Sequence, residues 1–300
     1  MPIEVVCKNV CSTVGEGPYW DEDSQLLYFV DIYARSVSRW NAEKGNVQKI
    51  TLDRTIGFVI PSKKGDVVIG LGQSFSRLEW DTESVTLIQT VDQDKKTRMN
   101  DGKCDPKGRL WAGTMGMETV PGIVEMGQGS LYCLDTDGKV TRHLENLNIP
   151  NGIVWSADEK TMYFIDSVPG IVYAFDYDIV NASIKNQKVI FQCQPKPQNT
   201  LGSPDGMTID KDGKLWIAFF FGGRIIQLDP DTGGIMNTHH MPAMSPSSCC
   251  FGGGNYDKLY VTSSRHGSSD EELALCPLSG SVFRITDLGT SGYPLAKYGG

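Results

Sequence analysis

The sequence predicts an all-β protein, and within that class a six-bladed β-propeller, from three observations. Two short strand-like patterns each recur six times in the same order, and polar turn residues separate most copies. Long apolar stretches with helical spacing and end caps are absent. Glycine and proline make up 48 of the 300 residues, or 16%, against the usual ~12%. A pair of β-sandwiches would also space its strands regularly, but the sixfold register favours the propeller.

The first pattern is a short apolar segment that in most copies follows a polar turn. Aspartate, glycine and proline form such turns through their own backbone and side-chain chemistry. Successive copies are 40, 43, 52, 53 and 44 residues apart. The six copies are Leu27-Tyr28-Phe29, Val67-Val68-Ile69, Leu110-Trp111-Ala112, Met162-Tyr163-Phe164, Leu215-Trp216-Ile217 and Leu259-Tyr260-Val261. One strand of each blade is expected at each copy.

The second pattern lies downstream of the first and alternates apolar with polar residues. Alternation with a period of two indicates a strand with one buried face. The six copies are Val37-Ser38-Arg39-Trp40-Asn41, Leu78-Glu79-Trp80-Asp81, Leu131-Tyr132-Cys133-Leu134-Asp135, Val172-Tyr173-Ala174-Phe175-Asp176, Ile225-Ile226-Gln227-Leu228-Asp229 and Val282-Phe283-Arg284-Ile285. Two independent patterns in one sixfold order predict six equivalent blades.

A further strand-like segment, Ile3-Glu4-Val5-Val6, precedes the first copy. We expect it to join the last blade, which carries Val282-Phe283-Arg284-Ile285, and so to close the ring. Closure of this kind leaves only short strand edges exposed. Residues 1–300 are then expected to form a single domain, with about 50 residues in each blade.

Composition argues against several classes of protein. A net charge of −8 without a basic block disfavours binding to nucleic acid or anionic lipid. The longest apolar runs, such as residues 26–30, are far shorter than the ~20 residues of a membrane span, and the first residues carry no secretory signal. The eight cysteines lack zinc-site spacing, which indicates unpaired, mostly buried thiols in a reducing compartment. We expect a cytoplasmic monomer.

Candidate functional residues emerge where the innermost strand of each blade should begin. Counting ten or eleven residues back from each apolar copy reaches one equivalent position per blade, and in a propeller these positions converge at one mouth of the central channel. The six positions hold Glu16, Gly57, Asn100, Asn151, Asp205 and Ser248. Four of them carry carboxylate or amide oxygens, the donors that Ca²⁺, Mg²⁺ and Mn²⁺ prefer and that can hold Zn²⁺ together with water. The alternative is that the Asn-Gly and Asp-Gly pairs are hairpin turns.

Arg98 is two residues before Asn100, so both side chains point the same way in an extended segment. A fixed cation beside a metal could bind an oxygen of a polyol or carboxylate substrate. The alternative is a surface arginine beside Lys95 and Lys96.

The sequence also resembles the regucalcin family, also called the senescence-marker-protein and gluconolactonase family, and most closely its animal branch. The resemblance covers nearly the whole chain and is carried by Gly15-Glu16-Gly17-Pro18-Tyr19-Trp20, Leu27-Tyr28-Phe29-Val30-Asp31-Ile32, Asn100-Asp101-Gly102-Lys103-Cys104-Asp105-Pro106, Ala112-Gly113-Thr114-Met115, Tyr163-Phe164-Ile165-Asp166-Ser167, Phe175-Asp176-Tyr177-Asp178, Pro204-Asp205-Gly206-Met207 and Ser248-Cys249-Cys250-Phe251-Gly252-Gly253.

The resemblance implies a six-bladed propeller with one divalent metal ion in its channel. The family's metal ligands fall on Glu16, Asn151 and Asp205, and its substrate contacts on Arg98, Asn100 and Glu118. The spacing argument reaches every one of these residues except Glu118. The implied activity is hydrolysis of sugar lactones such as glucono-1,5-lactone, with Ca²⁺ as the expected ion and Zn²⁺, Mn²⁺ or Mg²⁺ as alternatives for activity.

These observations lead to the hypothesis of a metal-dependent lactonase. The metal would polarise the lactone carbonyl, and Asp205 would act as general base toward the attacking water. Arg98, Asn100 and Glu118 would orient the sugar hydroxyls. Two alternatives stay open: a non-enzymatic calcium-binding regulator, and a related propeller hydrolase that acts on organophosphates or a luciferin intermediate.

Overall fold

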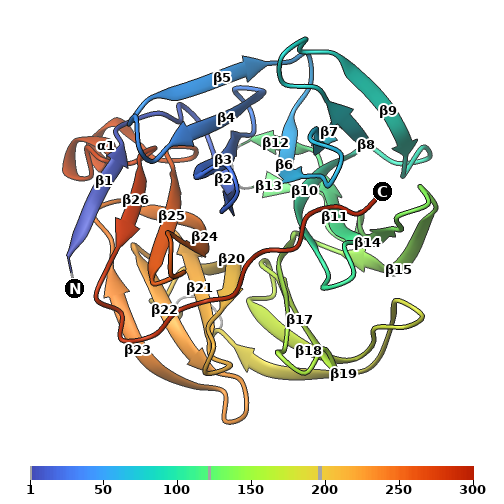
Figure 1. Ribbon diagram of the computed structural model, residues 1–300. Coiled ribbons are helices and arrows are strands. Elements are labelled where there is room, and N and C mark those ends of the chain that lie inside the picture. Colours follow the sequence, from blue (N-terminus) through green and yellow to red (C-terminus); the bar gives the residue numbers. More distant parts are fainter. Residues whose placement is uncertain (1, 121–122, 195–197) are drawn as a thin grey trace.

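Six four-stranded antiparallel sheets surround a central axis in the part of the chain that the structure describes (Figure 1). The structure is a computed structural model that describes residues 2–120, 123–194 and 198–300. The predicted all-β, six-bladed propeller is therefore confirmed, and the β-sandwich alternative is wrong. Each sheet is one blade, and below each blade is named by its innermost strand.

Within five of the six blades sequence order runs from the axis outward, and the remaining blade takes its outermost strand from residues 3–7. The innermost strands are β2 (Gly15–Asp21), β6 (Ile56–Pro61), β10 (Thr97–Cys104), β16 (Pro150–Trp155), β20 (Ser203–Ile209) and β24 (Ser245–Gly252). The second strands are β3 (Leu26–Asp31), β7 (Val67–Leu71), β11 (Leu110–Gly116), β17 (Thr161–Asp166), β21 (Leu215–Phe220) and β25 (Lys258–Ser264). Both sets are almost entirely buried, because each blade packs between two neighbours.

The outer half of each blade is progressively more exposed. The third strands are β4 (Ser36–Asn41), β8 (Ser74–Leu78), β14 (Gly129–Leu134), β18 (Ile171–Asp178), β22 (Arg224–Asp229) and β26 (Val282–Ile285). The outermost strands are β5 (Val47–Thr51), β9 (Val85–Thr90), β15 (Val140–Leu147), β19 (Ser183–Gln192), β23 (Gly234–His240) and β1 (Ile3–Cys7). A hairpin of β12 (Glu118–Val120) and β13 (Ile123–Val124) is inserted between β11 and β14.

The two repeating patterns correspond to the second and third strands of the blades. All six apolar copies lie in second strands, and five of the six alternating copies lie in or overlap closely with third strands. The exception is the β6 blade, where β8 ends at Leu78 and the predicted Glu79-Trp80-Asp81 follow the strand. The strand itself holds two apolar residues, Phe75 and Leu78, which are three residues apart, so its period-two pattern is weak.

Strand β1 is the outermost strand of the β24 blade. It pairs antiparallel with β26, with Ile3 opposite Ile285 and Val5 opposite Phe283. The blade therefore combines the first described strand of the chain with the last.

One short helix, α1 (Asp270–Leu275), was not expected from the sequence. The Ser269 hydroxyl accepts a hydrogen bond from the Glu272 amide, and the Glu272 carboxylate accepts one from the Ser269 amide. This reciprocal pair is a capping box. The Ser-x-x-Glu spacing is the sequence signal for this helix, and none of its residues is buried. No helix in the described ranges has the length and apolar character needed to cross a membrane.

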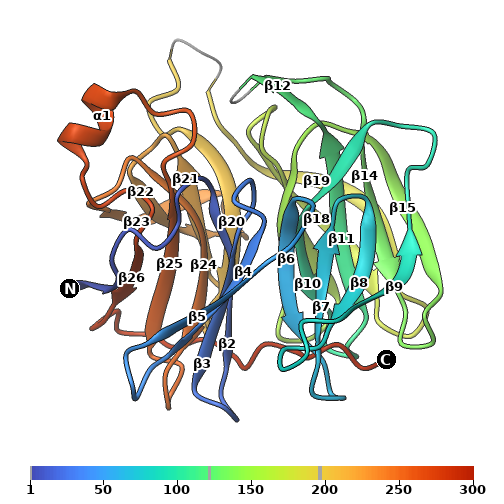
Figure 2. The ribbon, with the colours of Figure 1, turned by 90° about the horizontal axis from the view of Figure 1, so that it is seen from above.

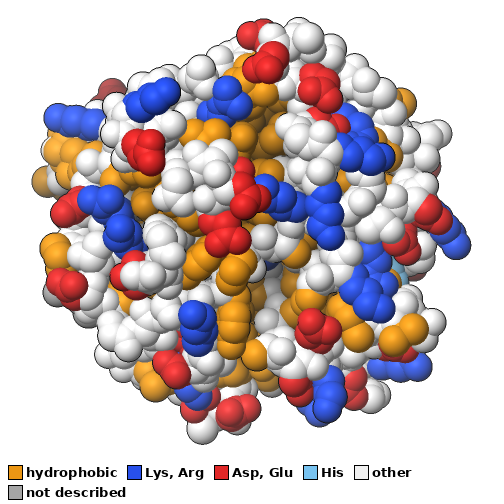
Figure 3. Space-filling model, viewed as in Figure 1, with side chains coloured by type: hydrophobic (Ala, Val, Ile, Leu, Met, Phe, Trp, Pro, Cys, Tyr) orange, Lys and Arg blue, Asp and Glu red, His pale blue; other side chains and the backbone are white. Residues whose placement is uncertain are grey.

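Residues 286–300, here called the C-terminal segment, cross one face of the ring (Figure 1). The Ser291 carbonyl accepts a hydrogen bond from the Lys211 amide in the β20 blade, and the Gly299 amide donates one to the Gly108 carbonyl in the β10 blade. Acidic and basic side chains are interspersed over this face (Figure 3). The segment thus ties together the ends of the innermost strands at this side of the channel.

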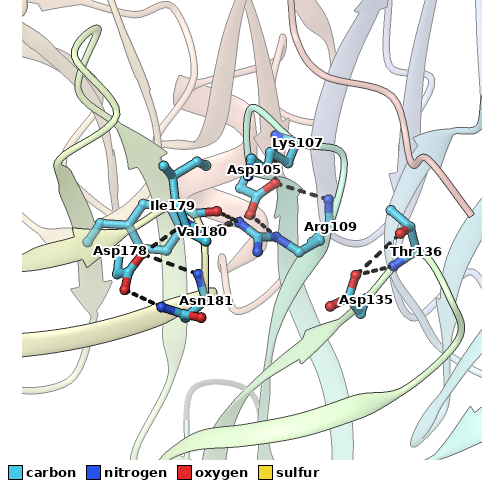
Figure 4. A network of polar contacts seen from close by, with 10 residues as sticks. Asp105, Lys107, Arg109, Asp135, Thr136, Asp178, Ile179, Val180 and Asn181 are labelled. Carbon is cyan, nitrogen blue, oxygen red and sulfur yellow. Dashed lines mark hydrogen bonds and ion pairs between the residues drawn. The ribbon is translucent and has the colours of Figure 1, made fainter.

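A buried ion pair links two adjacent blades. Asp105 follows β10 directly, is 0% exposed, and accepts a 2.6 Å hydrogen bond from Nε of Arg109. Arg109 Nη2 donates to the Ile179 carbonyl of the β16 blade at 2.7 Å, and the Tyr177 hydroxyl of that blade donates to Asp105 at 2.5 Å. Figure 4 shows the guanidinium spanning the space between the turn after β10 and the segment after β18. The pair therefore fixes one blade against the next.

All eight cysteines are unpaired, and seven of them are buried. This agrees with the expected thiol state.

Candidate active site

A cavity of about 660 Å³ opens where the innermost strands begin. Figure 2 shows β12 and α1 at this end of the molecule and the C-terminal segment at the other. Every residue predicted for the site lines the cavity: Glu16, Arg98, Asn100, Glu118, Asn151 and Asp205. Gly57 and Ser248 occupy the other two of the six equivalent repeat positions, carry no carboxylate or amide side chain, and do not line the cavity.

Each innermost strand carries a register shift at the repeat position that predicted these residues. The pairing of β2 with β3 shifts after Glu16, and that of β10 with β11 shifts across Asn100. The corresponding shifts in β16 and β20 begin at Asn151 and span Asp205. A β-bulge re-aims side chains that a regular strand would alternate between faces. The shared sequence phase thus corresponds to a shared backbone irregularity at the channel mouth.

The hairpin-turn alternative for the Asn-Gly and Asp-Gly pairs is wrong. Both pairs lie inside strands, Asn151-Gly152 in β16 and Asp205-Gly206 in β20. A Cβ on Gly152 would lie 2.8 Å from the Asp205 carbonyl oxygen, closer than real Cβ atoms approach. Glycine is therefore needed here because the innermost strands of neighbouring blades meet closely, which is a packing requirement and not a turn.

Three carboxyl groups are buried near one another: Glu16 and Asp205, which line the cavity, and Asp101, which does not. Burial, reinforced by repulsion from Glu16 and Asp101, raises the pKa of Asp205 well above its ordinary value. Burial and the charge of Asp101 likewise raise the pKa of Glu16, against the hydrogen bond from the Gly17 amide. Burial also raises the pKa of Asp101, although the nearby Lys103 charge acts in the opposite direction. The cluster therefore holds protons unless a cation offsets its mutual repulsion.

A chain of hydrogen bonds runs beside these carboxyl groups. Arg98 Nη1 donates to Asn100 Oδ1 at 2.8 Å, and Asn100 Nδ2 donates to Asn151 Oδ1 at 3.1 Å. Asn151 Nδ2 in turn donates to the Ser167 hydroxyl at 2.8 Å. Arg98 is 4% exposed, so the surface-arginine alternative is wrong. Its Nε has no partner among the described residues and remains a donor for a ligand oxygen.

The residues present fit a divalent cation by their chemistry. Glu16, Asn151 and Asp205 offer only oxygen donors, which suit hard ions such as Ca²⁺ and Mg²⁺. A cation between the two carboxylates would replace the protons that their crowding retains. Among the described residues, no three His, Cys, Asp or Glu side chains are arranged to hold a metal, so the predicted set depends on the amide of Asn151.

Glu118 reaches the cavity from β12, outside the repeat. Its Oε2 lies 2.7 Å from Nε2 of His266, a residue that follows β25. The His266 ring stacks on Tyr33 with centroids 4.7 Å apart, and the Tyr33 hydroxyl accepts a 3.1 Å hydrogen bond from Arg98. The mouth of the cavity therefore combines residues from the first, third and last blades.

Burial would raise the pKa of Glu118, but other interactions outweigh it. Hydrogen bonds from His266 and Tyr33, together with the His266 and Arg98 charges, lower the pKa below its ordinary value. A carboxyl with a lowered pKa stabilises the fold above its unfolded-state pKa, and this contribution is lost as the pH falls through the folded-state pKa.

We expect the His266→Ala variant to raise the pKa of Glu118. The variant loses the largest of the favourable contacts while the burial of the carboxyl persists. A ¹³C NMR titration of the Glu118 carboxyl measures the shift directly. His240→Ala, which removes an exposed histidine on β23, serves as the control and should leave the titration unchanged. An unaltered Glu118 pKa in His266→Ala would contradict this account of the mouth.

Three residues of the site were missed by sequence reasoning. Asp101 adjoins Asn100, and the pairing of β10 with β11 shifts across both residues. Side chains there do not alternate regularly between the two faces, so the sequence did not indicate which way Asp101 points. Tyr33 and His266 follow second strands, so they do not occupy the repeat position at the start of an innermost strand. The ends of the second strands are the sequence signal that could have identified them.

Comparison with known proteins agrees with this geometry. A family model described as "SMP-30/Gluconolactonase/LRE-like region" matches residues 14–265. The chain is 44% identical to regucalcin of Sus scrofa over 299 residues, covering 99% of this chain and 98% of that protein. A luciferin-regenerating enzyme superposes with a TM-score of 0.91 at 36% identity, covering 99% of both chains. A calcium-binding protein, regucalcin from Agrobacterium tumefaciens, gives 0.89 at 25% identity, covering 98% of this chain and 96% of that one.

Proposed function

Because this chain belongs to the SMP-30/gluconolactonase/LRE-like family, we propose that it is a metal-dependent hydrolase of sugar lactones such as glucono-1,5-lactone. The observation that carries the proposal is the convergence of Glu16, Asn151 and Asp205, from three different blades, on one cavity. A buried set of oxygen donors beside a cavity of ligand size suits a reaction centre.

A bound divalent ion polarises a carbonyl and stabilises the negative charge that develops on its oxygen. Glu16, Asn151 and Asp205 would hold this ion, with Ca²⁺ as the expected one.

Asp205 would accept a proton from the water that attacks the lactone carbonyl carbon, because its carboxyl lines the cavity from the innermost strand β20. The ring C–O bond then breaks, the ring oxygen takes up a proton, and one water plus one lactone gives one hydroxy acid.

Arg98 and Glu118 would orient the substrate, Arg98 as a positively charged donor and Glu118 as a negatively charged acceptor. The unpartnered Nε of Arg98 can donate to a lactone or hydroxyl oxygen, and Glu118 can accept from a sugar hydroxyl. The Asn100 amide already bonds Arg98, Asn151 and the Pro150 carbonyl, so it would also hold these neighbours in place.

The metal requirement is tested by removing and restoring the ion. We expect chelated protein to lose hydrolysis of glucono-1,5-lactone, and added Ca²⁺, Mg²⁺, Mn²⁺ or Zn²⁺ to restore it to different extents. Proton release measured in weakly buffered solution reports the turnover, and the spontaneous hydrolysis of the lactone is the blank. A protein that binds Ca²⁺ and hydrolyses no lactone would instead favour a calcium-binding regulator. Full activity after chelation would contradict the metal dependence.

A further inference from the structure

The cavity is lined by two chemically different groups of side chains. Its base carries the charged and amide side chains of the innermost strands, whereas part of its outer wall is apolar, beside the amides of Gln192, Gln194 and Asn199. Val168 and Pro169 lie in the turn after β17, Phe220 is the last residue of β21, and Phe221 follows it. Together with Ile149, which precedes β16, they line one side of the opening. This wall belongs to the β16 and β20 blades, opposite the polar group formed by Tyr33, Glu118 and His266.

Two residues of this wall are apolar side chains with large exposed fractions. Val168 is 44% exposed and Phe221 is 45% exposed, although both are large apolar side chains. Phe221 also has a backbone φ of 56°, in the left-handed region that a bulky residue rarely adopts. Its ring meets that of Phe220 edge to face, with centroids 4.8 Å apart. A strained and exposed aromatic residue at a cavity mouth points to a ligand that covers it.

The size of the cavity supports the same conclusion. Cavities of 300–1,000 Å³ typically bury drug-sized ligands, and about 660 Å³ falls well inside that range. The polar base alone provides contacts for a small hydroxylated ring. The space between that base and the phenylalanines is therefore left for a second, apolar part of a ligand.

We propose that this protein acts on lactones that carry an apolar substituent, with the lactone ring at the polar base and the substituent against Val168, Phe220 and Phe221. The inference rests on the proposed lactonase activity and names a substrate class for it. The reaction is the same hydrolysis: the substituent stays on the carbon that bears the ring oxygen, and it leaves as part of the hydroxy acid.

A series of δ-lactones that differ only in their alkyl substituent tests the inference with the metal-loaded protein. δ-Valerolactone has no substituent, and δ-octalactone and δ-decalactone carry propyl and pentyl groups. We expect kcat/KM to rise by about fourfold for each methylene that the wall buries. A kcat/KM that does not depend on chain length, while glucono-1,5-lactone is hydrolysed, would overturn the inference and leave the proposed function intact.

Phe221→Asn examines the wall itself, because asparagine tolerates the left-handed backbone better than phenylalanine. We expect the ratio of kcat/KM for δ-decalactone to that for δ-valerolactone to fall, while the unfolding temperature stays equal or increases. Glu159→Asn is the matched control: Glu159 is also exposed with a φ of 59°, in the turn after β16 at the opposite end of the channel. It should leave the ratio unchanged. An unchanged ratio in Phe221→Asn would contradict a role for this wall.

Binding separates failure of the inference from failure of the proposed activity. Alkyl-substituted δ-lactams resist hydrolysis and share the ring shape of the lactones. By calorimetry, we expect the pentyl-substituted δ-lactam to bind the wild-type protein more tightly than the unsubstituted one, with the difference reduced in Phe221→Asn. Such a result would sustain the apolar subsite even if no lactone were turned over. Equal affinities would overturn it whatever the activity.

Discussion

We expect the Asp205→Asn variant to lose hydrolysis of glucono-1,5-lactone by a factor of about 10²–10⁴, the usual contribution of a general base. The same variant should lose the rise in unfolding temperature that Ca²⁺ gives the wild-type protein, because one of its two charged ligands is gone. Without metal, the variant should be at least as stable as the wild type. The reason is that it no longer buries three carboxyl groups together.

Asp101→Asn is the matched control for this prediction. Asp101 is buried in the same cluster and its removal relieves the same repulsion, but it is not among the predicted ligands. Asp101→Asn should therefore keep a Ca²⁺-dependent rise in unfolding temperature. Differential scanning calorimetry with and without Ca²⁺ gives both results. Loss of the rise in Asp101→Asn with its retention in Asp205→Asn would show that the ligand set is assigned wrongly.

The largest loss of stability is expected from Asp105→Ala. This variant leaves the Arg109 guanidinium buried without its carboxylate and removes the acceptor of the Tyr177 hydroxyl. Breaking a buried ion pair by removing one partner costs about 3–5 kcal/mol. Urea unfolding followed by circular dichroism measures the difference in free energy of unfolding.

Asp158→Ala gives the reference for this comparison. Asp158 also accepts turn hydrogen bonds, from the Ser156 hydroxyl and the Lys160 amide, but it is exposed and forms no hydrogen bond to another blade within the described ranges. Its loss should cost at most about 0.5 kcal/mol, as for most surface positions. Similar losses of unfolding free energy in the two variants would mean that the contacts of the Asp105–Arg109 pair with the neighbouring blade add no stability beyond the turn hydrogen bonds.

Much of the fold could be predicted because the propeller repeats itself. A buried second strand needs a continuous apolar segment such as Leu215-Trp216-Ile217. Six such segments give six maxima of hydropathy along the sequence. A strand with little apolar content, such as the serine-rich β8, gives no comparable signal and was placed too late. The capping box before α1 is visible in the sequence, but six residues without an apolar face do not stand out.

The site was predictable as far as it shares the repeat. Glu16, Asn151 and Asp205 occupy one position of one repeating strand, so their convergence follows from the ring. Glu118 could be assigned only through a family resemblance, because its hairpin is an insertion that no other blade has among the described residues. His266 reaches the site from the segment after β25, and nothing in its local sequence indicates that Glu118 will be beside it.

The pairing of β1 with β26 has a consequence for how the chain folds. Glu4 and Arg284 lie opposite each other across a separation of 280 residues. Contacts this distant in sequence slow folding, because the intervening chain must be ordered before they form. During synthesis on a ribosome, β1 emerges long before β26, so the other five blades can assemble while β1 has no partner strand. A strand without its partner can associate with other chains, so this protein should depend most on chaperones in the interval before β26 is released.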